Sequence, residues 1–154
     1  MKRIIVLLSI LAVVMLSGCA TRIKQGDYTG DPTLKANLLA EDACKGMVAV
    51  YPPASTKLSL KSEVKDDFGA ALVEKLRASG FAVLEPTSAV RRKAEEIMTP
   101  EVEQGLLFSY VLDNVPEEQL MRLTLFVGES SLSRAYRSMA GGSVAPAGAW
   151  VRKE

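Results

Sequence analysis

The feature that most constrains the fold is a strand–helix–strand pattern near the middle of the chain. Met47–Tyr51 (MVAVY) is an apolar run closed by two prolines, which predicts a short buried strand. Ser62 is a candidate helix N-cap, and Gly80 a candidate stop. Between them, apolar residues recur at helical spacing: Val64, Phe68, Ala71, Leu72 and Leu76. Phe81–Leu84 (FAVL) predicts a second strand, so the pattern indicates a βαβ unit with parallel strands.

Further helices and strands complete the predicted domain. Helices are predicted over Leu34–Cys44, ending near Gly46, and over Thr87–Met98. From Gly105 the period changes to two, which predicts half-buried antiparallel strands. They cover Leu106–Asp113, Leu123–Val127, Leu132–Arg137 and Ala149–Arg152, with a turn at Asn114–Glu118 and a loop at Ala140–Ser143. We therefore expect residues 34–154 to form a single α/β domain, a small two-layer sandwich with a βαβ unit, then antiparallel strands, and helices on one face.

The N-terminus has the layout of a secretory signal peptide. Lys2 and Arg3 precede Ile4–Leu16, which is apolar except for Ser9. As a helix this stretch would span about 20 Å, less than the ~30 Å hydrocarbon core of a bilayer. Residues 1–18 are therefore predicted to be a signal peptide rather than a transmembrane helix.

The end of this segment, Leu16-Ser17-Gly18-Cys19, resembles the lipobox of bacterial lipoprotein precursors. The resemblance implies that Cys19 becomes an acylated N-terminus, and two or three acyl chains make membrane anchoring effectively permanent. The alternative is an ordinary secretory signal that Cys19 merely follows. Residue 20 is alanine and not the aspartate that retains such proteins at the inner membrane, which favours the periplasmic face of the outer membrane. Residues 19–33 are predicted to be the lipidated N-terminus and a flexible tether, since Thr21–Thr33 is polar and without period.

Composition excludes several classes of function. Without residues 1–18, the chain has 136 residues (154 − 18) with 17 basic and 18 acidic side chains, and this balance argues against a nucleic-acid surface. It has no histidine, which removes the commonest general base and zinc ligand. The acidic pairs Asp66-Asp67 and Glu95-Glu96 are helix neighbours whose side chains diverge, so we interpret them as surface charge. We expect no enzyme, no catalytic residues, no metal, no cofactor and no small-molecule substrate.

The sequence also contains one thiol outside the lipobox, Cys44. Two interpretations remain open for it. It is either a shielded small residue at the edge of the fold, or a thiol that pairs between chains in an oxidising compartment.

Several stretches together resemble the TrbH family of conjugal transfer lipoproteins. They are Tyr51–Ala54 (YPPA), Phe68–Val73 (FGAALV), Gly80–Val83 (GFAV), Val127–Tyr136 (VGESSLSRAY) and Ala145–Arg152 (APAGAWVR). The resemblance implies an outer-membrane structural component of mating-pair formation, the type IV secretion apparatus that transfers plasmid DNA, whose partners are other channel proteins. The alternative is a periplasmic lipoprotein that binds partners in envelope assembly, unrelated to conjugation.

The C-terminal third contains a candidate partner interface. Arg134, Tyr136 and Trp150 are residue types favoured at interface hot spots, and on a strand Arg134 and Tyr136 share one face. If Leu132 shares that face, the row is core instead, and Trp150 is a packing anchor. Both interpretations remain open, and the last strand is also a candidate open edge.

Overall fold

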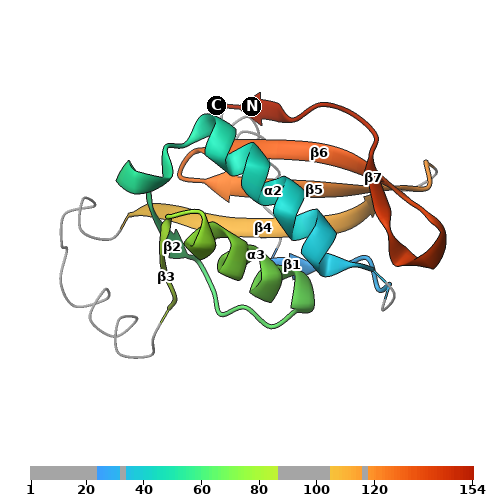
Figure 1. Ribbon diagram of the computed structural model, residues 1–154, viewed down its shortest axis with the longest axis horizontal. Helices are drawn as coiled ribbons and strands as arrows, with labels where there is room; N and C mark the ends of the chain where they lie inside the picture. The colour runs from blue at the N-terminus through green and yellow to red at the C-terminus, as the bar shows by residue number, and fades with distance from the viewer. Residues whose placement is uncertain (1–23, 32–33, 87–104, 116–117) are drawn as a thin grey trace, which may run out of the picture.

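In the part of the chain that the structure describes, the fold is a single mixed sheet with two helices on one face (Figure 1). The computed structural model describes residues 24–31, 34–86, 105–115 and 118–154. The strands are β1 (Gly26–Asp27), β2 (Lys57–Leu60), β3 (Ala82–Leu84), β4 (Leu106–Val115), β5 (Leu120–Val127), β6 (Ser130–Ser138), β7 (Val144–Pro146) and β8 (Val151–Lys153). The helices are α2 (Ala36–Val50) and α3 (Asp67–Ala78), with 3-10 turns η1 (Pro53–Ser55) and η2 (Ala140–Gly142). The strand order is β3-β2-β4-β5-β6-β7, with β1 paired to β4 and β8 to β6. The α/β class with helices on one face is confirmed.

The βαβ unit exists, but its first strand is not the predicted one. Met47–Tyr51 is not a strand: all but its last residue belong to α2, which runs through to Val50. The reason is visible in the burial of α2, where Leu39, Ala43 and Met47 recur every four residues and are fully buried, while Val48 is exposed. The apolar run that begins at Met47 therefore continues the buried stripe of α2 and does not start a strand. The strand lies just beyond, at β2, after the prolines and η1.

Helix α3 and the strands on either side of it form the parallel unit. Leu58 of β2 pairs with Val83 of β3, in parallel. The predicted stripe is confirmed, because Phe68, Leu72 and Leu76 are buried. The N-cap is Asp66, not Ser62, and its carboxylate accepts a hydrogen bond from Gly69 N at 2.8 Å. Gly80 has φ +94°, the left-handed conformation that glycine adopts most easily, and it ends the helix as predicted.

The predicted antiparallel strands are also present. In β4, β5 and β6, cross-strand partners such as Tyr110 and Leu125, and Leu125 and Leu132, point toward the helices and are buried. The predicted last strand is β8, which pairs antiparallel with β6. No pattern in the sequence indicated β7, which pairs with the other end of β6 and follows the η2 turn in the predicted loop. The predicted helix Thr87–Met98 lies outside the described residues.

The predicted tether is wrong for the stretch that includes β1. Gly26 and Asp27 pair in parallel with Val111 and Leu112 of β4, and Tyr28 N donates to Leu112 O at 2.7 Å. The side chain of Asn114 donates to Thr29 O at 3.1 Å. These hydrogen bonds hold residues 26–29 against β4. The sequence shows no pattern for this strand, because it is two residues long and has no apolar residue.

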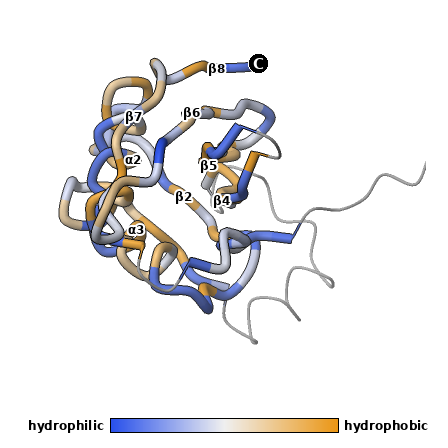
Figure 2. Tube along the Cα trace, turned by 90° about the vertical axis from the view of Figure 1, so that its right-hand side faces the viewer, coloured by the Kyte–Doolittle hydropathy of each residue, from blue (hydrophilic) through white to orange (hydrophobic). Residues whose placement is uncertain are grey.

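The hydrophobic core lies between the sheet and the two helices. Seen from the side, α2 and α3 lie together on one face of the sheet (Figure 2). Their buried residues meet the inward side chains of β4, β5 and β6. The largest fully buried side chains are Tyr110, Tyr136, Phe68, Phe108, Leu39, Met47, Leu58, Leu72, Leu76, Leu112, Leu123 and Leu125. Two of these twelve are tyrosines, so each brings a hydroxyl into the core that needs a partner.

Candidate functional site

The structure brings together the three residues that the sequence indicated as a candidate interface. Tyr136 is buried with 1% of its surface exposed, and its hydroxyl donates to Asp42 Oδ2 of α2 at 2.6 Å. Arg134 Nη1 lies 3.0 Å from both carboxylate oxygens of Asp42. The Arg134 Nε donates to Gly148 O at 2.8 Å. One carboxylate on α2 therefore binds two side chains of β6, and the same arginine holds the loop between β7 and β8.

Trp150 completes this cluster, which we call the α2 anchor (Asp42, Gly46, Arg134, Tyr136 and Trp150). The indole ring meets the Tyr136 ring edge-on at a centroid distance of 6.5 Å, and the Arg134 guanidinium lies 5.8 Å from its centre. A Cβ atom at Gly46 would lie 2.6 Å from Trp150 Cε2. The helix can therefore approach the indole this closely only because residue 46 is glycine.

The α2 anchor bears on the two interpretations of this surface. Leu132 and Tyr136 share the buried face of β6, each 1% exposed, as the core alternative requires. The Arg134 side chain is 19% exposed and is engaged with Asp42 inside the domain. The geometry favours the core alternative, in which Arg134, Tyr136 and Trp150 hold α2 and the C-terminal segment against the sheet.

A second tyrosine–aspartate pair anchors the other helix. Tyr110 Oη donates to Asp66 Oδ2 at 2.7 Å, and the Tyr110 ring meets Phe68 edge-on at 5.3 Å. The Asp66 carboxylate also caps α3 through Gly69 N. The interpretation of Asp66 as surface charge is therefore wrong, because one of its oxygens satisfies the helix end and the other a buried hydroxyl. The sequence contained only a weak sign of this role, an aspartate directly before a helical stripe.

Both anchoring tyrosines hold their protons strongly. Burial, followed by the hydrogen bond to Asp66, raises the pKa of Tyr110 well above its usual range. Burial and the hydrogen bond to Asp42 raise the pKa of Tyr136 in the same way. Because both phenols stay protonated and donate to carboxylates, neither is an available base or nucleophile near neutral pH, and their role is structural.

These shifts predict a loss of stability at alkaline pH. Above about pH 10 the tyrosines of the unfolded chain lose their protons while Tyr110 and Tyr136 keep theirs. The unfolded state then binds fewer protons, so the free energy of unfolding falls by about 1.4 kcal/mol per pH unit for each tyrosine. Urea unfolding at several pH values above 9 should show a shallower decline for Tyr136→Phe than for the unaltered chain. Equal slopes would contradict the assignment.

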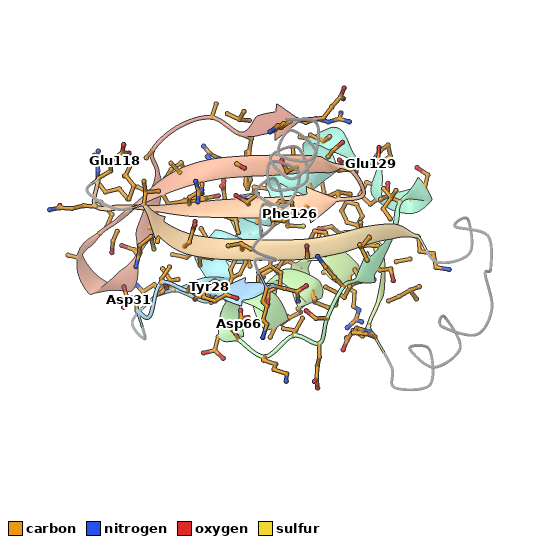
Figure 3. The ribbon with its side chains drawn as sticks, turned by 180° about the vertical axis from the view of Figure 1, so that it is seen from behind. Tyr28, Asp31, Asp66, Glu118, Phe126 and Glu129 are labelled. Carbon is orange, nitrogen blue, oxygen red and sulfur yellow. The ribbon has the colours of Figure 1, made fainter. Side chains whose placement is uncertain are left out.

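The opposite face of the sheet is a separate surface. Side chains that alternate with the core residues of β4, β5 and β6 point away from the helices, and we call the accessible ones the open sheet face: Ser109, Thr124, Phe126, Ser131 and Ser133. Val111 is on the same side of the sheet but is buried. Figure 3 looks onto this face, with Phe126 near its centre. Within the described part of the chain, both helices lie on the other side. Phe126 is 39% exposed, and Ser133 bonds Thr124 across the strands at 3.2 Å.

Charges lie around the open sheet face rather than on it. Arg122 and Asp113 form a bidentate ion pair on the next cross-strand row, with Nη2 2.6 Å from Oδ2. Lys153 of β8 pairs beside Ser131, and Glu129 is at the β5–β6 turn. An uncharged centre with an aromatic residue and a charged rim is the usual anatomy of a protein–protein interface.

Cys44 is shielded, as one of the two interpretations predicted. It is 5% exposed, and its Sγ lies 3.1 Å from Ser79 Oγ. A groove of about 400 Å³ runs beside it between α2 and α3, with Val48, Ala49 and Ala78 in its wall. Among the described residues, no group of three or more histidine, cysteine, aspartate or glutamate side chains is placed to hold a metal ion.

Comparison with known families decides the identity of this domain. The family model described as conjugal transfer protein TrbH matches residues 24–154. These residues include every described strand, both described helices and both tyrosine–aspartate pairs. The chain belongs to the TrbH family. No curated protein sequence and no solved structure matches it significantly.

Membership of the TrbH family confirms the resemblance noted in the sequence. The chain is a conjugal transfer protein, which favours conjugation over an unrelated role in envelope assembly. The match starts at residue 24, and so it covers the domain but not Leu16, Ser17, Gly18 and Cys19, which lie outside the described residues. Within the described residues, no helix is long and apolar enough to cross a membrane.

Proposed function

We propose that this TrbH family protein is an outer-membrane lipoprotein and a structural component of the mating-pair apparatus. The observation that carries the proposal is the family match across residues 24–154. The lipobox at Leu16–Cys19 supports anchoring through Cys19, and Ala20 supports the outer membrane. In this role the domain is non-catalytic and is held at the periplasmic face, where it contacts other channel proteins.

The open sheet face is the surface that we assign to this contact. The residues first considered for it, Arg134 and Tyr136, are engaged with Asp42 inside the domain. By contrast, the side chain of Phe126 is exposed, and the serine and threonine side chains around it are uncharged. This surface therefore does not require a charged partner. We expect the partner to be another subunit of the channel, with a flat apolar surface that also carries hydrogen-bonding groups.

The anchor is tested by replacing the proposed acylated cysteine. Cys19→Ala should abolish labelling of the protein by a clickable palmitate and leave it unprocessed or released from the membrane. Ala20→Asp should keep the label and move the protein toward inner-membrane fractions. Equal palmitate labelling of Cys19→Ala and the unaltered chain would contradict the anchor, and an unchanged distribution of Ala20→Asp would contradict the outer-membrane assignment.

The contact surface is tested by plasmid transfer from cells that carry altered copies of the gene. Phe126→Glu places a charge at the centre of the open sheet face, and we expect it to reduce transfer sharply at unchanged protein abundance and melting temperature. Leu38→Glu is the matched control, because Leu38 is a similarly exposed apolar residue (47%) on the helix side. Equal transfer by the two variants would remove the open sheet face from the interface.

A further inference from the structure

Residues 24–28 and 61–66 form one patch of the surface, which we call the N-terminal patch. Gln25 Nε2 donates to Ser62 O at 3.3 Å, and this bond joins the first described residues to the loop that precedes α3. Tyr28 Oη donates to Lys24 O at 2.9 Å, so the phenol lies along the incoming chain. Figure 3 shows Tyr28 and Asp66 near one another at the edge of the sheet. The patch is therefore the place where the chain enters the domain.

The hydrogen bonds of β1 fix how far this patch can be from residue 19. The chain is held from Gln25 onward by the Ser62 bond and by the pairing of Gly26 and Asp27 with β4. Cys19 is six positions before Gln25 in the chain, and six residue steps span at most about 20 Å when fully extended. A domain of this size has a diameter of roughly 35 Å, from a radius of gyration near 14 Å. The connection is shorter than the domain is wide.

We propose that the N-terminal patch, with Tyr28 at its centre, rests on the phospholipid surface of the membrane that holds the anchor. The inference depends on the proposed acylation of Cys19. An acylated cysteine lies at the headgroup level, and the headgroups themselves occupy about 5–7 Å of each leaflet. The short connection then brings the patch, rather than the far side of the domain, against the lipid.

The side chains of the patch suit a headgroup layer. Tyr28 is 52% exposed, and an exposed tyrosine has an apolar ring and a polar hydroxyl, the combination favoured at membrane–water interfaces. Lys24 and Lys61 of the patch are exposed and can reach lipid phosphates on their flexible stems. Each of the three carboxylates of the patch has a partner: Asp27 accepts from Thr29 N at 2.8 Å, Glu63 lies 3.8 Å from Lys65, and Asp66 binds Tyr110 and Gly69.

The orientation is measured on the full-length lipoprotein, extracted from membranes and reconstituted in vesicles of phosphatidylethanolamine and phosphatidylglycerol. Cys44→Ser removes the buried thiol, and a serine there keeps a small polar group beside Ser79. Tyr28→Cys then provides one site for an environment-sensitive fluorophore. Glu129→Cys is the control, at the β5–β6 turn away from Tyr28 in Figure 3. Both positions are exposed, so neither change should disturb the fold.

We expect lipids with a quencher near the headgroup to reduce the fluorescence at position 28 and to leave that at position 129 unchanged. Equal quenching at the two positions, or none at position 28, would overturn the orientation. Palmitate labelling of the same preparations separates this result from the proposed anchor. Labelled protein without quenching at position 28 contradicts the orientation alone, whereas unlabelled protein contradicts the anchor and the orientation together.

Discussion

Gly69→Ala is expected to lower the free energy of unfolding by about 2–4 kcal/mol, although alanine favours helix by about 1 kcal/mol relative to glycine. A Cβ atom at residue 69 would lie 1.8 Å from Tyr110 Oη and 2.5 Å from its Cζ. Both atoms belong to the Tyr110 side chain, which is fully buried and whose ring packs against Phe68. Either α3 moves away from the sheet, or Tyr110 gives up its hydrogen bond to Asp66, and each response costs stability.

Urea unfolding of the domain measures this loss. Gly148→Ala is the control, since nothing lies within 4 Å of a Cβ atom at that position. It should change the free energy of unfolding by less than about 0.5 kcal/mol. A Gly69→Ala domain as stable as the Gly148→Ala domain would show that α3 does not approach Tyr110 as closely as described.

The second large effect is expected for Asp42→Ala in the α2 anchor, with a loss of about 2–4 kcal/mol. The change leaves the buried Tyr136 hydroxyl without its acceptor and the half-buried Arg134 without its counter-charge. Glu41→Ala is the matched control on the same helix. Glu41 pairs with Lys45 in solvent, where such a pair contributes little to stability.

Asp42→Ala, together with Arg134→Ala, also tests the role of the anchor in plasmid transfer. If Asp42, Arg134 and Tyr136 act only by holding α2, then Asp42→Ala and Arg134→Ala should reduce transfer in proportion to the lost protein. Thermal melts and immunoblots from the same cells provide the comparison. Loss of transfer at full abundance and unchanged melting temperature would return Arg134 to the partner interface.

Periodicity predicted the elements that bury one regular face. Helix α3 and strands β4 and β5 each repeat buried apolar residues at a single spacing along most of their length. The errors fall on shorter segments. Met47–Tyr51 predicts a strand because five apolar residues fit either period, and only the fully buried Leu39 and Ala43 upstream show that the helix continues to Val50. The two-residue β1 is defined by backbone pairing with β4, and no side-chain pattern marks it.

The candidate site shows a different limit. Arginine, tyrosine and tryptophan are favoured at interfaces because they combine large apolar surface with polar groups, and the same properties suit a polar cluster at the edge of a core. The sequence identified Arg134, Tyr136 and Trp150 as a group but could not name their partner. Asp42 is 92 residues before Arg134, and no spacing rule connects such positions.

The bonds of the α2 anchor also bear on when the domain can fold. Tyr136 and Asp42 are 94 residues apart, and Asn114 and Thr29 are 85 apart, so the N-terminal elements complete their contacts only after the C-terminal strands exist. At roughly 5–20 residues per second, synthesis alone delays these contacts by about 5–20 s. Native structure dominated by such distant pairings also forms slowly. Under the export that we propose for this protein, α2 has no anchor while the C-terminal strands are still being synthesised, so a chain that enters the inner-membrane translocon during synthesis is expected to enter it unfolded.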